Sequence, residues 1–102
     1  MARAIEIARK AVDTDGTLPY AAIVVLDGEI IGEGLNRSVA NCDPTSHGEV
    51  EAIRDACRRL SLTSLKGAEL YTSGEPCSMC VATMYQVGIS RLYYAGTADD
   101  SA

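Results

Sequence analysis

The chain has 102 residues, of which 47% are hydrophobic, and it carries a formal net charge of -5 at pH 7. This length predicts one domain over residues 1–102 with a single hydrophobic core. The longest apolar run, residues 20–26, is far too short to cross a bilayer, and 14 acidic against 9 basic residues disfavour a polyanion as partner. We therefore expect a cytoplasmic protein that acts on a small molecule.

The first half of the chain predicts a helix followed by a β-hairpin. Ile5, Ala8 and Val12 recur at helical spacing, which indicates a helix over residues 2–13. Residues 20–26 form a continuous apolar run that is typical of a strand buried on both faces. Asp27-Gly28 has the composition of a two-residue turn, so residues 29–32 are expected to return as the partner strand. Residues 33–46 then form a polar loop.

The second half of the chain predicts two helices, each followed by a strand. One helix should cover residues 47–60 and precede a strand over residues 69–72. The next should have Pro76 in its first turn, where a missing N–H is tolerated, and should stop at Gly88 before a strand over residues 91–95. Because β-α-β crossovers are right-handed, the last two strands should be parallel. This order predicts an α/β fold, a three-layer α/β/α sandwich with a central mixed sheet.

Two short motifs, His47-Gly48-Glu49 and Pro76-Cys77-Ser78-Met79-Cys80, fall at the N-terminal ends of these two helices. The single histidine of the chain with two thiolates is a donor set that suits Zn2+. Three protein ligands leave a fourth position for water, as in catalytic zinc sites, and Glu49 would be a spare carboxylate able to move a proton. Cys42 is the one candidate for a fourth ligand, which would make the zinc site structural instead.

Each part of this constellation also has a plainer interpretation. His47 could be a helix-capping residue. Ser46 and Glu49 have the spacing of a capping box, in which the glutamate only bonds a backbone N–H. Cys77 and Cys80 have the spacing of a thiol redox pair. None of these interpretations explains why the residues occur together.

The two motifs resemble the signature of the zinc-dependent cytidine and deoxycytidylate deaminase superfamily, which combines His-x-Glu with Pro-Cys-x-x-Cys. Further similar stretches are residues 19–25, 34–37, 43–49 and 70–80. The resemblance covers almost the whole chain and is closest to the branch of guanine deaminases and tRNA adenosine deaminases. It implies a cytidine deaminase-like fold.

The resemblance also implies roles for particular residues. The zinc ligands of the superfamily correspond to His47, Cys77 and Cys80. Glu49 corresponds to the residue that shuttles protons, and Asn36 to the asparagine that hydrogen-bonds the substrate ring. From the residues alone, an asparagine in a polar loop could equally form an Asx turn.

The activity implied is the hydrolytic deamination of a nucleobase or nucleoside, with release of ammonia. A guanine-type substrate is favoured; cytosine or tRNA adenosine deamination is the alternative, as is a catalytically inactive zinc-binding domain on the same fold. Tyr20 could shape the pocket, although a core aromatic is the safer interpretation. Members of the superfamily usually continue beyond the last predicted strand, so this chain is expected to be short at the C-terminus and to cover its exposed sheet edge by forming a homodimer.

Overall fold

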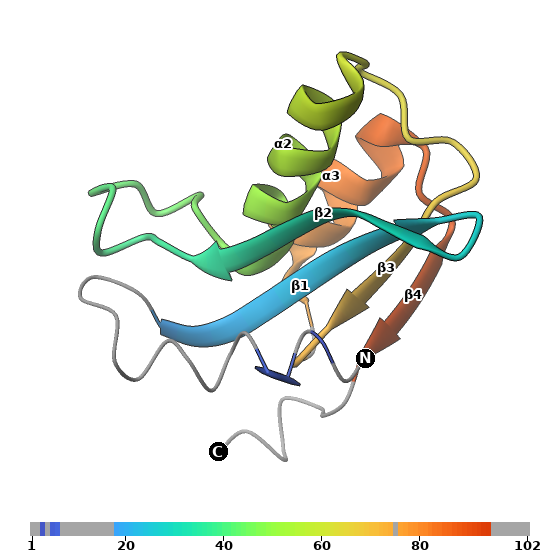
Figure 1. The fold of residues 1–102 in the computed structure, drawn as a ribbon. Coiled ribbons are helices and arrows are strands. Elements are labelled where there is room, and N and C mark those ends of the chain that lie inside the picture. The colour runs from blue at the N-terminus through green and yellow to red at the C-terminus, as the bar shows by residue number, and fades with distance from the viewer. Residues whose placement is uncertain (1–2, 4, 7–17, 75, 95–102) are drawn as a thin grey trace.

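The computed structural model describes residues 3, 5–6, 18–74 and 76–94 (Figure 1). Its strands and helices are, in chain order, β1 (Leu18–Leu26), β2 (Glu29–Asn36), α2 (Gly48–Leu60), β3 (Glu69–Thr72), α3 (Ser78–Val87) and β4 (Arg91–Tyr94). Residues 3, 5 and 6 are helical, and the rest of the helix predicted over residues 2–13 lies outside the described residues. Within the described part, no helix has the length and apolar character needed to cross a membrane.

The four strands form one mixed sheet in the order β2-β1-β3-β4. β1 is antiparallel to both β2 and β3, whereas β3 and β4 are parallel and are joined through α3. This confirms the predicted hairpin and the predicted crossover. The strand predicted over residues 29–32 was too short, because β2 continues to Asn36 and pairs with β1 as far back as Leu18.

The turn between β1 and β2 takes the predicted form. Asp27 has a φ of 52° and Gly28 a φ of 81°, so both residues lie in the left-handed region that a two-residue hairpin turn of type I′ requires. The right-handed twist of the two strands matches this turn. The hairpin therefore fixes the register of β2, the strand against which α2 packs.

α2 and α3 lie on the same face of the sheet (Figure 1). A hydrophobic core fills the space between them and the sheet; its buried members are Ala22, Val24, Ala52, Ile53, Ala56, Leu65, Ala68, Leu70, Met84, Val87 and Ile89. On β2, the side chain of Glu33 alternates to the other face and bonds that of Arg3. The α/β architecture with a central mixed sheet is thus confirmed, and the predicted third layer begins with the helical residues near Arg3.

Glycine allows α2 to approach β2 unusually closely. A Cβ atom at Gly34 would overlap the backbone nitrogen of Ala52 and the carbonyl oxygen of Gly48, and one at Gly32 would overlap the carbonyl oxygen of Ala52. The φ of Gly34 is not positive, so it is the lack of space, and not the backbone conformation, that calls for glycine there. This contact fixes the height at which α2 begins above the sheet.

Candidate functional site

The N-terminal end of α2 presents His47 and Glu49. His47 is the N-cap residue, with an extended backbone (φ -71°, ψ 157°), and Glu49 is the second residue of the helix. Gly48 lies between them against β1, where a Cβ atom would come within 2.8 Å of the carbonyl oxygen of Tyr20. The start of α2 is therefore pressed onto the backbone of β1, which limits where both side chains can point.

The loop before α2 is held by hydrogen bonds near its end. The N–H of Arg37 donates to the carbonyl oxygen of Ser46 over 2.8 Å, and Ser46 is fully buried. The carboxylate of Asp43 accepts from the hydroxyl of Thr45 (2.6 Å) and from its N–H (2.9 Å), and these bonds lower the pKa of Asp43, the hydroxyl bond most. His47 thus follows a closed turn and not a free loop.

The N-terminal end of α3 presents Cys77 and Cys80. Cys77 is the N-cap residue, also extended (φ -79°, ψ 173°), and Cys80 is the third residue of the helix. The prediction that Pro76 lies in the first turn is wrong, because α3 begins at Ser78. The side chain of Cys77 projects from the cap and that of Cys80 from the first turn, so both reach the same side of the helix.

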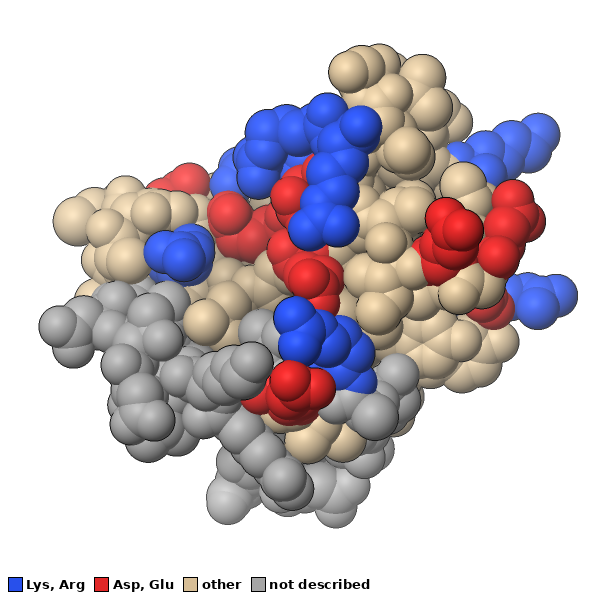
Figure 2. All heavy atoms as spheres, viewed as in Figure 1, with Lys and Arg blue, Asp and Glu red and all other residues tan. Residues whose placement is uncertain are grey.

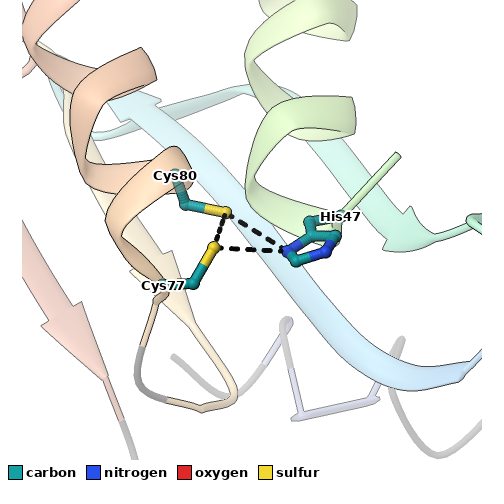
Figure 3. Close-up of side chains that lie close together, drawn as sticks. All are labelled: His47, Cys77 and Cys80. Atoms are coloured by element: carbon teal, nitrogen blue, oxygen red, sulfur yellow. Dashed lines mark hydrogen bonds between the residues drawn. The ribbon is translucent and has the colours of Figure 1, made fainter. Parts of the chain in front are cut away.

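The three candidate ligands form a nearly equilateral triangle (Figure 3). Nδ1 of His47 lies 3.6 Å from Sγ of Cys77 and 3.6 Å from Sγ of Cys80, and the two sulfur atoms are 3.6 Å apart. In a tetrahedral site Zn2+ bonds sulfur at about 2.3 Å and nitrogen at about 2.0 Å, so the ligand atoms lie about 3.5 to 3.8 Å from one another. The triangle has the dimensions of one face of such a tetrahedron. Of the described residues, only these three form a group that could hold a metal ion.

The surroundings of the triangle favour a bound cation. Cys80 is fully buried, and burial, followed by the nearby negative charge of Glu49, raises the pKa of its thiol. A thiol in such a place gives up its proton only if a positive charge replaces it. A Zn2+ ion would supply that charge, and the N-terminal ends of two helices add a smaller positive potential.

Glu49 lies beside the triangle without forming a part of it. It is 8% exposed, and its negative charge is near enough to help raise the pKa of the Cys80 thiol. The capping-box interpretation is wrong, since the N-cap of α2 is His47 and not Ser46, and no side chain bonds the cap. Glu49 is thus a nearly buried carboxylate next to a candidate metal centre.

Asn36 ends β2 on the face that packs against α2, and it is 7% exposed. Its side-chain oxygen accepts from the N–H (3.0 Å) and the hydroxyl (2.8 Å) of Ser38. This is the Asx turn foreseen as the alternative. These two bonds use the oxygen of the amide and leave its nitrogen as the group that could bind a ligand.

Tyr20 is a residue whose position the sequence did not predict. We expected a core aromatic, but the side chain is 46% exposed. A Cβ atom at Gly74 would lie 3.8 Å from its ring, and its carbonyl oxygen abuts Gly48. The backbone of Tyr20 therefore lies against the start of α2, and its exposed ring lies beside the segment that leads into α3. The sequence did contain a sign of these close contacts, because Gly48 and Gly74, the residues that Tyr20 approaches, both lack a side chain.

Cys42 does not join the candidate metal centre. It is exposed, and its Sγ lies 3.9 Å from the carbonyl oxygen of Val39. The group of candidate ligands among the described residues does not include it. The arrangement offers three protein ligands and not the four of a closed structural zinc site.

The chain belongs to the family described as the cytidine and deoxycytidylate deaminase zinc-binding region, whose model matches residues 1–96. A guanine deaminase from Bacillus subtilis (strain 168) is 41% identical over 100 residues, which make up 98% of this chain and 64% of that protein. A tRNA-specific adenosine deaminase from Agrobacterium fabrum (strain C58 / ATCC 33970) is 43% identical over 94 residues, 92% of this chain and 61% of that protein.

A solved structure supports the same assignment. The X-ray structure of guanine deaminase from Bacillus subtilis superposes with a TM-score of 0.92 at 40% sequence identity, over 98% of this chain and 64% of that one. The chain therefore has the cytidine deaminase-like fold, and it spans less than two thirds of the length of the relatives named here. The family is a zinc-binding one, and the donor set of the triangle fits that ion.

Proposed function

We propose that this protein is a zinc-dependent hydrolytic deaminase of a nucleobase or nucleoside. The observation that carries the proposal is the triangle of one nitrogen and two sulfur atoms, 3.6 Å on each side, with the nearly buried carboxylate of Glu49 beside it. His47, Cys77 and Cys80 are the proposed ligands of Zn2+. Glu49 is the proposed proton carrier.

When bound, the zinc ion lowers the pKa of a water molecule to about 7 and so makes it a nucleophile near neutral pH. Glu49 would hold the proton that the attacking water molecule loses and would deliver it to the ring nitrogen next to the carbon under attack. The same carboxylate would then carry the remaining proton of the added hydroxyl group to the amino group, so that the C–N bond breaks, ammonia leaves and a carbonyl remains. Because Glu49 is nearly buried, its carboxylate and not bulk water would transfer these protons.

A guanine-type substrate is the form of the proposal that we favour. It is supported by the likeness to the Bacillus subtilis guanine deaminase and by the exposed ring of Tyr20, against which a planar base could stack. The amide nitrogen of Asn36 would donate a hydrogen bond to the ring. The tRNA-specific adenosine deaminase among the relatives keeps an RNA substrate as the second candidate, and cytosine is the third.

The test is ammonia release by the zinc-loaded protein on a panel of guanine, guanosine, cytosine, adenosine and an anticodon stem-loop. Release from one of them should fall roughly 100- to 10,000-fold in Glu49→Gln, the range typical of lost general acid–base catalysis, while the zinc content stays the same. Glu29→Gln is the matched control, because Glu29 is exposed at the start of β2 and should leave the rate unchanged. Zinc bound without any ammonia release would favour an inactive zinc-binding domain.

We also infer that the working form is a homodimer. α3 is ten residues long, contains no charged residue and exposes Tyr85 at 77%. A helix that is apolar on most of its sides is ordinarily covered on most of its sides. A second copy of a chain with a net charge of -5 would dock best where charge is absent, and α3 provides such a surface.

A further inference from the structure

The proposed metal centre is built from two halves that come from different parts of the chain. His47 caps α2, and Cys77 caps α3, 30 residues later. Their ligand atoms nevertheless lie 3.6 Å apart, and β1 passes beside both helix ends (Figure 3). We therefore examined β1 for contacts that set the distance between the two halves.

The half on α2 is fixed on β1 through Gly48. A Cβ atom at Gly48 would lie 2.8 Å from the carbonyl oxygen of Tyr20 and 3.2 Å from Cα of Ala21. The start of α2 is thus in direct contact with the backbone of these two residues. His47 is the residue before Gly48, so its position depends on where the backbone of Ala21 lies.

The half on α3 is fixed on the same residue of β1 through Ser73. Ser73 directly follows β3 and lies four residues before Cys77. Its N–H donates to the carbonyl oxygen of Ala21 over 2.9 Å, and its hydroxyl oxygen accepts from the N–H of Ala21 over 3.0 Å. Ser73 therefore bonds both backbone groups of Ala21.

The hydroxyl of Ser73 takes the place of a backbone carbonyl. β1 and β3 are antiparallel, and Ala22 with Thr72 is the last pair of their register. In a regular ladder the next two opposed residues, Ala21 and Ser73, would exchange two backbone hydrogen bonds. Because the side chain supplies the second acceptor, the chain can leave the sheet at this point. The hydroxyl of Thr72 donates to the carbonyl oxygen of Gly74 and holds the chain where it turns away.

The N–H of Ala21 depends on this hydroxyl. Ala21 is 1% exposed, so bulk water cannot replace the hydroxyl as the partner of its N–H. A buried N–H without a partner is costly, and the acceptor that a regular ladder would use is the carbonyl oxygen of Ser73 itself. Without the hydroxyl, that bond would draw the segment before α3 toward the sheet and would displace Cys77.

We propose that Ser73 is a positioning residue of the zinc site. Its hydroxyl fixes the segment before α3 on Ala21, the residue that also contacts the start of α2, and so sets the distance between His47 and the two cysteines. The inference rests on the proposed function only in that these three residues are taken as the ligands of Zn2+. The hydroxyl is then required for tight metal binding with the right geometry, and not for folding.

The test is removal of the hydroxyl in Ser73→Ala. The Kd for Zn2+, measured by competition with a chelator, should rise roughly 10- to 100-fold, the range typical when a group that orients metal ligands is removed. The absorption bands of bound Co2+, which depend on ligand type and geometry, should shift or weaken. Ser73→Thr keeps a hydroxyl at the same position and should restore both readouts.

Ser64→Ala is the matched control. The hydroxyl of Ser64 also accepts from a backbone N–H, that of Lys66 over 3.4 Å, in the exposed connection between α2 and β3. This variant should keep the Zn2+ affinity and the Co2+ bands of the wild type.

Wild-type readouts in Ser73→Ala, an equal loss in Ser64→Ala, or no restoration in Ser73→Thr would overturn the inference and leave the zinc site itself in place. Loss of the fold in zinc-free Ser73→Ala, measured by circular dichroism, would also overturn it, because the hydroxyl would then have a purely structural role. A wild-type protein that binds no zinc would overturn the proposed function together with the inference, so the two failures are distinguishable.

Discussion

The equal spacing of His47, Cys77 and Cys80 follows from where each residue lies in its helix. Two are N-cap residues with extended backbones and the third lies in a first turn, so all three side chains project beyond the ends of α2 and α3. The backbone of β1 sets the position of α2, since it meets Gly48 without room for a Cβ atom. The ligand geometry is thus held by backbone contacts outside the triangle.

Replacing Cys77 by serine should therefore abolish stoichiometric zinc binding. A serine hydroxyl is a poor ligand for Zn2+, and two remaining ligands cannot hold the ion firmly. The rise in Tm on adding zinc, roughly 10 to 20 °C for a ligand present at about 100 times its Kd, should be lost with it. Metal analysis and thermal unfolding with and without zinc measure both effects.

Cys42→Ser is the control for this exchange, because it makes the same chemical change at an exposed cysteine outside the triangle. It should retain one zinc ion per chain and the full rise in Tm. Loss of zinc in Cys42→Ser would instead support a closed structural site in which Cys42 is the fourth protein ligand. Full zinc content in Cys77→Ser would contradict the assignment of the ligands.

At the scale of the elements, the contact between β2 and α2 depends on the absence of side chains. Gly34→Ala should destabilise the fold by about 1 to 3 kcal/mol, the usual cost of overpacking, because its Cβ atom would overlap backbone atoms of α2 that cannot turn aside. Zinc affinity should fall as well, since any shift of α2 moves His47. Urea unfolding at an unchanged m-value measures the first effect.

Gly74→Ala is the matched control for Gly34→Ala. Its new Cβ atom would meet nothing closer than the ring of Tyr20, at 3.8 Å, and Gly74 has no positive φ. Its free energy of unfolding should stay within about 0.5 kcal/mol of the wild type, as expected for a tolerated substitution. Similar losses in the two variants would mean that α2 is not held by close approach at Gly34.

The elements also show what the sequence could and could not predict. The turn at Asp27-Gly28 and the strand over residues 69–72 were predicted from local chemistry, because turn residues and apolar runs act over a few positions. The length of β2 was not predicted from local chemistry. Its glycines have low strand propensity, and they form a strand because they pair with β1. The N-cap positions of His47 and Cys77 likewise depend on packing that spacing alone does not reveal.

At the scale of the whole molecule, distant residues combine in ways that a linear sequence conceals. The four candidate site residues could be foreseen together because two motifs mark them. A groove whose lining includes Arg3, Arg37 and Arg58 could not be foreseen, because it forms only when β2, α2 and the N-terminal residues are assembled (Figure 2). The net charge of the chain therefore did not reveal the groove between the free edge of β2 and α2, where four arginines and three acids come together.

The uneven charge of the surface also bears on self-association. Two chains of net charge -5 repel each other, and salt weakens this repulsion only beyond about 8 to 10 Å. The proposed dimer would therefore form most readily through a surface that is apolar and free of charge, and the outer side of α3 with Tyr85 is such a surface. The proposed ligands Cys77 and Cys80 lie at the start of the same helix, so docking there would also shield the proposed zinc site.

Tyr85→Asp should accordingly shift the protein from dimer to monomer. A charge at the centre of an apolar interface loses its hydration without gaining a partner, and the loss of a buried tyrosine anchor typically costs at least about 2 kcal/mol, or roughly 30-fold in the dissociation constant. Analytical ultracentrifugation at micromolar concentration measures the change.

Ile30→Asp is the control, because it places the same charge on another exposed apolar residue. Ile30 lies on β2, the edge strand at the other end of the sheet from β4, and the substitution should leave the dimer intact. A wild-type protein that sediments as a monomer, or dissociation by Ile30→Asp alone, would remove α3 as the interface.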